Sequence, residues 1–118
     1  MTLDSLELAR LIVDVVEEHK ADNIVLLDLR PHTIIADFFV LCNGNSPRQI
    51  KALMEYVHES VKEKTGQNAF STEGTAESGW VLMDYGTVIV HIFHEEQRHY
   101  YKLEELWSGV GQVLVSIQ

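Results

Sequence analysis

The hexapeptide GNSPRQ at residues 44–49 constrains the fold more than any other stretch of the sequence. Serine is a favoured helix N-cap, proline is favoured at the first helical position, and glutamine three residues after the cap can complete a capping box. Apolar residues then recur at helical spacing as far as Gly66, and glycine commonly ends a helix. We therefore expect a helix that is capped by Ser46, begins at Pro47 and stops at Gly66.

Two short apolar runs come before this helix. They are NIVLLDL at 23–29, which Arg30 and Pro31 end, and DFFVLCN at 37–43, which Gly44 ends. Their length and their β-branched and aromatic residues predict two largely buried strands. Cys42 lies in the second run, where a cysteine usually packs as a small hydrophobic residue.

A hairpin is predicted later in the chain, where Tyr85 and Gly86 separate WVLMD from TVIVHIF at 87–93. Strand alternation places Trp80, Leu82 and Asp84 on one face. Trp80 is equally suited to the core and to an interface, since tryptophan is common in both. Tyr85 at the tip is harder to bury, which favours an interaction surface.

The remaining segments of the chain also carry structural signals. Asp4 followed by Glu7 resembles a capped helix start, and helical spacing continues to about Lys20. A short edge strand is expected around 69–72, followed by a flexible loop at 73–79. A third helix is expected from about Glu95, and residues 109–118 are either a last strand or an ordered extension. The third helix would carry Tyr100, Leu103 and Trp107 on one face.

These elements predict an α/β fold with a mixed β-sheet, helices packed on it, one crossover near the start and one hairpin later. A chain of 118 residues has the usual size of one domain, so residues 1–118 are expected to form a single domain. With 46% hydrophobic and 23% charged residues, the composition is that of a folded, soluble protein.

Charge narrows the class of partner. The chain has 18 acidic and 9 basic residues, and its net charge of -9 repels nucleic-acid backbones and anionic membrane surfaces. It suits a basic protein partner, or no special partner. One cysteine excludes an intramolecular disulfide, and the sequence shows neither a targeting pattern nor an apolar run long enough to span a membrane. A cytoplasmic protein is expected.

The histidines do not form a recognisable metal motif. His94 and His99 in HEEQRH are five residues apart, which on a helix turns the second imidazole about 140° from the first. They cannot share a zinc ion from one regular helix. His91 lies in mid-strand, where we expect a sheet-face residue with a hydrogen-bond partner.

A nucleotide-binding or nucleotidyltransferase-type enzyme is the main alternative. The Gly-Asn-Ser turn before a helix N-terminus suits an anion, and Asp84 could bind a metal ion with a second acid such as Asp37. However, the neighbours of Asp84 on its own face are apolar, and helix capping already accounts for Ser46. Asp84 also suits the approach to a tight turn, where its carboxylate can accept backbone hydrogen bonds.

Three long segments carry a family resemblance. They are DLRPHTIIADFFVLCNGNSPRQIKAL, EGTAESGWVLMDYGTVIVHIF and RHYYKLEELW, and they resemble the ribosomal silencing factor family, also called Iojap, from about Asp22 to Trp107. The resemblance implies a fold similar to a nucleotidyltransferase core without catalytic residues. It implies neither a cofactor nor an enzymatic activity.

The resemblance also implies a partner. Members of this family bind the large ribosomal subunit through ribosomal protein uL14 and obstruct joining of the small subunit, which lowers translation when nutrients are scarce. The partner-binding region falls on Trp80, Asp84 and Tyr85, and Leu82 shares the face of Trp80. His91 and Phe93 match family positions and either contact the partner or hold the sheet. A homodimer is also compatible with the family.

Overall fold

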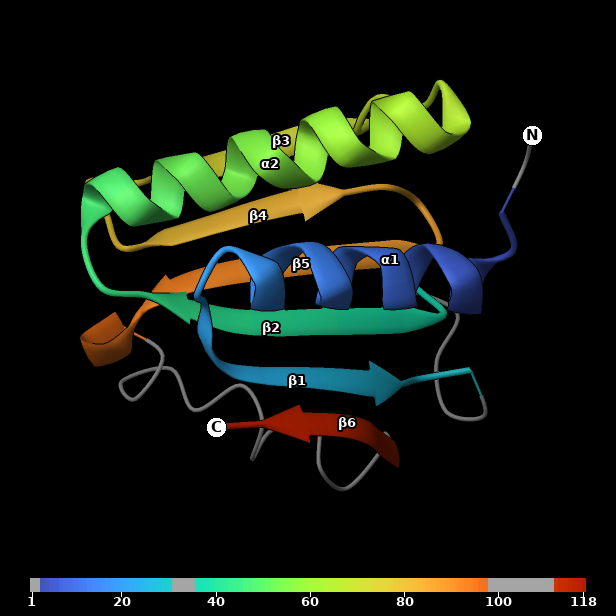
Figure 1. Ribbon diagram of the computed structural model, residues 1–118, viewed down its shortest axis with the longest axis horizontal. Coiled ribbons are helices and arrows are strands. Elements are labelled where there is room, and N and C mark those ends of the chain that lie inside the picture. The colour runs from blue at the N-terminus through green and yellow to red at the C-terminus, as the bar shows by residue number, and fades with distance from the viewer. Residues whose placement is uncertain (1–2, 31–35, 98–111) are drawn as a thin grey trace.

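The computed structural model describes residues 3–30, 36–97 and 112–118, and these form a six-stranded sheet with helices packed on it (Figure 1). This arrangement confirms the predicted α/β class. The elements, in chain order, are α1 (Ser5–Glu18), β1 (Asp22–Asp28), β2 (Phe38–Gly44), α2 (Pro47–Thr65), β3 (Ser71–Thr75), β4 (Trp80–Asp84), β5 (Val88–His94) and β6 (Gln112–Ile117).

The sheet is mixed, with the strand order β3-β4-β5-β2-β1-β6. β2 and β5 are parallel, and every other neighbouring pair is antiparallel. The crossover between the parallel strands runs through α2, and the β3–β4 pair also lies between them in sequence. β4 and β5 form the predicted hairpin. Because β2 and β5 occupy the centre, their side chains are buried on both faces of the sheet.

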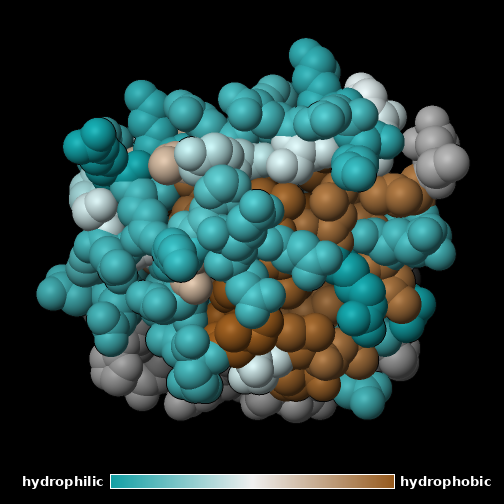
Figure 2. Space-filling view, in the orientation of Figure 1, coloured by the Kyte–Doolittle hydropathy of each residue, from teal (hydrophilic) through white to brown (hydrophobic). Residues whose placement is uncertain are grey.

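α1 and α2 cover one face of the sheet, as Figure 1 shows. The main core lies between these helices and the sheet, and it includes Ile12, Leu53, Val40 and Val90. Cys42 is fully buried in this layer, which confirms its predicted role as a small hydrophobic residue. On this side the surface of α2 is mostly hydrophilic, and hydrophobic surface lies lower in the view (Figure 2). Neither α1 nor α2 has the length and apolar character needed to cross a membrane.

The helix ends follow the predicted signals. The Glu7 amide donates to the Asp4 carboxylate at 2.8 Å, and the Asp4 amide donates back to Glu7 at 3.1 Å, which completes a capping box. The Gln49 amide donates to Ser46 Oγ at 3.1 Å. The Gln49 side chain accepts from the Asn45 amide, so only half of the second capping box forms as predicted. Gly66 ends α2 in the left-handed conformation with φ 74°.

The predicted loop at 73–79 starts too early, because β3 continues to Thr75 through hydrogen bonds to β4. The remaining turn is held by Ser78, whose Oγ donates to the Thr75 carbonyl at 2.8 Å. The final segment is a strand, β6, which pairs with β1. Residues 95–97 have helical backbone, whereas Tyr100, Leu103 and Trp107 of the predicted third helix lie outside the described residues.

Candidate functional site

The face of the sheet opposite α1 and α2, called the second face below, has its own apolar cluster. Partly buried apolar side chains, among them Trp80 and Leu82, pack against it. The buried members are Leu27, Leu29, Ala36, Phe39, Leu41, Ile89 and Phe93. The second face therefore combines a packed centre with apolar side chains that are still accessible at its margin.

β4 lies at this margin and alternates strictly in burial. Trp80, Leu82 and Asp84 are half-buried, whereas the two residues between them are buried against the helices. These three residues are called the β4 row below. Their shared face confirms the predicted alternation. An indole, an isobutyl group and a carboxylate thus follow one another along one accessible line.

Aromatic rings of the neighbouring strand β5 support the Trp80 side chain. Its Nε1 donates a hydrogen bond to His91 Nδ1 at 3.3 Å, and its ring stacks on Phe93 with centroids 5.3 Å apart. The cross-strand register explains both contacts, because Phe93 is directly opposite Trp80 and His91 is the diagonal neighbour. Trp80 therefore contributes to packing and to accessible surface at once.

His91 is a sheet-face residue with a hydrogen-bond partner, as the sequence predicts, and the structure identifies that partner as Trp80. The residue is only 4% exposed, and its ring lies 4.7 Å from Phe39 and 6.0 Å from Phe93. Burial lowers the pKa of His91 to about 4, so the imidazole is neutral at physiological pH. Because Nδ1 accepts from the indole, the proton of the neutral ring is on Nε2.

Asp84 ends the β4 row at the hairpin turn. Its Oδ1 accepts a hydrogen bond from the Gly86 amide at 2.7 Å, which confirms the local turn role considered for this residue. Gly86 has φ 85°, a left-handed conformation that glycine adopts without steric cost. Asp84 remains partly exposed, so its negative charge is available at the surface beside Leu82.

Tyr85 contradicts the prediction of an exposed hairpin tip, because it is only 1% exposed and belongs to the core beneath the helices. The physical reason is that Tyr85 continues the alternation of β4 and points away from Asp84. Its amide still pairs with the Val88 carbonyl at 2.9 Å. Burial raises the pKa of its phenol to about 12. Tyr85 is therefore removed from the surface that the β4 row presents.

Phe70 is the exposed aromatic residue near this turn, with 74% of its surface accessible. Its ring packs so closely on Gly86 that a Cβ atom there would lie 2.7 Å from Phe70 Cε2. Phe70 was not among the predicted site residues, although it lies within the predicted edge strand at 69–72 and directly precedes β3 in the structure. A large aromatic side chain next to an exposed edge was the available signal.

A cavity of about 280 Å³ lies beside the β4 row. Trp80 and Leu82 form apolar walls, and Glu73 of the edge strand adds a carboxylate directly across from Leu82. Gly74, Ser78 and Gln97 complete the described lining. An apolar hollow beside two acidic side chains, Glu73 and Asp84, suits an apolar side chain of a basic protein.

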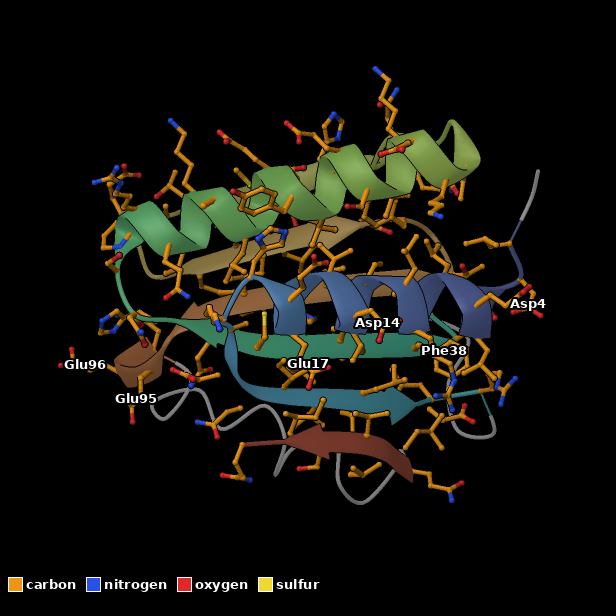
Figure 3. The ribbon with its side chains drawn as sticks, in the orientation of Figure 1. Asp4, Asp14, Glu17, Phe38, Glu95 and Glu96 are labelled. Carbon is orange, nitrogen blue, oxygen red and sulfur yellow. The ribbon has the colours of Figure 1, made fainter. Side chains whose placement is uncertain are left out.

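The structure separates the parts of the nucleotide-binding alternative. β2 runs from Phe38 at one end of the sheet to the Ser46 turn at the other, and Asp84 lies at the Phe38 end. Roughly five strand residues, or about 17 Å, separate the two along the sheet. Figure 3 shows these two ends of the sheet, with Phe38 at one end and, at the other, Glu95 and Glu96, which follow the β5 residue that pairs with Gly44. Asp84 and the Ser46 turn therefore do not form one site.

Asp37 lies at the same end as Asp84, because its amide donates to the Thr87 carbonyl of the hairpin at 2.8 Å. Nevertheless, within residues 3–30, 36–97 and 112–118 no three His, Cys, Asp or Glu side chains are grouped as a metal site requires. The described acids therefore offer no two-metal centre of the kind that nucleotidyl transfer uses.

Comparison with known proteins gives a consistent result over almost the whole chain. Residues 2–117 match the family model described as "Ribosomal silencing factor during starvation". The ribosomal silencing factor of Halalkalibacterium halodurans is 39% identical over 107 residues, which are 91% of each chain. The Bacillus subtilis factor of the same name is 38% identical over 92 residues, covering 78% of this chain and 77% of the relative.

A solved structure supports the same assignment. The crystal structure of a Chromobacterium violaceum protein superposes on this chain with a TM-score of 0.84 at 33% sequence identity. The superposition covers 90% of this chain and 88% of the Chromobacterium violaceum chain. Fold, sequence identity and coverage thus agree with the resemblance carried by the three sequence segments. The chain belongs to the ribosomal silencing factor family.

Proposed function

We propose that this protein lowers translation by binding the large ribosomal subunit at ribosomal protein uL14 and blocking access of the small subunit. The observation that carries this proposal is the β4 row, where Trp80, Leu82 and Asp84 are half-buried on one face at the margin of a packed apolar cluster. The family's name describes a regulatory role, and the proposed mechanism requires neither a cofactor nor a chemical step.

The proposed contact combines an apolar anchor with charge. An apolar side chain of uL14 would enter the hollow that Trp80 and Leu82 line, and Asp84 would face a basic side chain. A net charge of -9 favours approach to a basic ribosomal protein, and the position of Asp84 opposite a basic side chain would set the orientation of docking. Tryptophan anchors at the centre of an interface commonly account for about 2 kcal/mol or more of binding free energy. The bound protein then occupies space that the small subunit needs.

Tyr85 has a different role in this proposal. Its ring supports the hairpin from the helix side, so it stabilises the surface without touching the partner. We also propose that residues 1–118 act as one cytoplasmic domain. A homodimer that used the β4 row would compete with uL14 for the same face.

Co-sedimentation with purified large subunits tests the proposal, together with an assay of subunit joining. Trp80→Ala and Asp84→Arg are expected to lose binding and to permit joining. Glu63→Arg is the matched control for charge, because Glu63 is exposed on α2, away from the second face. The mass of the unbound protein shows whether a dimer competes. If both β4-row variants sediment and inhibit like the wild type, the proposed surface is wrong.

A further inference from the structure

The Trp80 indole rests on a buried histidine that is poorly placed to contact any partner. We propose that His91 is a positioning residue, which holds the Trp80 indole in the orientation that the ribosomal partner recognises; this inference rests on the function proposed above. The hydrogen bond from Trp80 Nε1 to His91 Nδ1, 3.3 Å long, is the contact through which His91 acts.

Two supports act on the indole in different ways. Stacking on Phe93, with an interplanar angle of 25°, fixes the height and tilt of the ring. Stacking alone does not distinguish the two ring orientations that are related by a half-turn about the Cβ–Cγ bond, because both keep the same indole plane against Phe93. The hydrogen bond to His91 removes that remaining freedom, because it fixes where Nε1 points.

His91 is itself held in place. It is directly opposite Leu82 across the hairpin, and its ring is nearly parallel to that of Phe93, with an interplanar angle of 7°. Phe39 contacts the imidazole from the neighbouring strand β2, with ring centroids 4.7 Å apart. A buried ring with contacts from two strands cannot readily change rotamer, so Nδ1 is a fixed acceptor.

Packing alone does not explain a histidine at this position. Nε2 is buried and makes no hydrogen bond with any part of the structure described here. A buried N–H without a partner destabilises the folded state, and phenylalanine would fill the same space without that cost. What an imidazole supplies, and phenylalanine does not, is the acceptor for the indole N–H.

Preorganisation gives the expected size of the effect. When a large side chain is mobile in the free protein and becomes ordered on binding, the lost conformational freedom raises Kd by about 2- to 10-fold. Loss of the acceptor should therefore weaken binding to large subunits by about that factor. Loss of the anchor itself, in Trp80→Ala, should weaken binding considerably more.

The test compares His91→Phe, which keeps a stacked ring and removes the acceptor, with His91→Asn, whose side-chain oxygen can take the place of Nδ1. Kd for purified large subunits and the NMR signal of the Trp80 indole N–H are measured for each. We expect His91→Phe to weaken binding about 2- to 10-fold and to shift the indole signal. His91→Asn should stay within about twofold of the wild type. If His91→Phe fails to fold, His91→Leu replaces it.

A double-mutant cycle separates positioning from general stability. In a Trp80→Phe background, which has no indole N–H, His91→Phe should cause no further loss of affinity. Equal losses with and without the indole would overturn the positioning role, as would wild-type affinity for His91→Phe. If Trp80→Ala itself binds normally, the proposed surface is wrong and the role of His91 is lost with it. If only Trp80→Ala loses binding, the surface stands and the positioning role is wrong.

Discussion

The two faces of β4 divide its five residues between two different environments. Val81 and Met83 are buried against the helices and hold the hairpin to the core. Trp80, Leu82 and Asp84, on the other face, are half-buried and remain available to a partner. In the function proposed above, the face that packs under the helices fixes the strand, and the other face binds the partner.

The largest effect should come from placing a charge on each face in turn. Val81→Asp puts a carboxylate into a fully buried position and should lower the free energy of unfolding by at least about 4 kcal/mol. Leu82→Asp, one residue away, should leave most of the stability and remove binding to large subunits. Urea unfolding and co-sedimentation measure the two properties. Similar stability losses in both variants would mean that the two faces do not differ as described.

The second face should also respond to pH through His91. Its pKa is about 4 when folded and near 6.5 when unfolded, so the unfolded chain binds more protons below pH 6.5. Stability that is complete above pH 6.5 is therefore lost as the pH falls towards 4, by about 3 kcal/mol from this residue. Urea unfolding at pH 7, 5 and 4 measures the loss. His91→Phe should show a smaller loss, and an identical pH profile in that variant would contradict the assignment.

A smaller effect is expected on the helix side at Tyr85. The phenol oxygen is buried and makes no hydrogen bond to any described residue, so Tyr85→Phe removes an uncompensated polar group. The free energy of unfolding should rise by about 1 kcal/mol, while affinity for large subunits stays the same. Calorimetric melting and a binding titration check both expectations. Weaker binding of Tyr85→Phe to large subunits without a loss of stability would mean that Tyr85 contacts the partner after all.

Local signals account for most of what the sequence predicts correctly. The helix ends at Asp4, Ser46 and Gly66 depend on residues within one turn, so they can be identified without knowing the fold. The β4 row follows from alternation within a single strand, which is also a local property. The position of the hairpin turn can likewise be predicted from Gly86, because a tight turn depends on the residues within it.

Apart from the half-formed capping box at Gln49, which is a local difference, the incorrect and missing predictions depend on contacts between different elements of the fold. Tyr85 is buried because it packs into the core that α1 and α2 cover, and no residue near the hairpin indicates this. The bond between Trp80 and His91 depends on the register of β4 against β5, which a hairpin motif does not fix to one residue. Phe70 becomes significant only because β3 brings it beside Gly86.

The most direct test of the central claim is calorimetric titration of purified uL14 into this protein and into Trp80→Ala. We expect saturable binding of one uL14 per chain, weakened about 30-fold or more by Trp80→Ala, with both proteins folded under the same conditions. Absence of binding to uL14, or equal affinity for the wild type and Trp80→Ala, would contradict it.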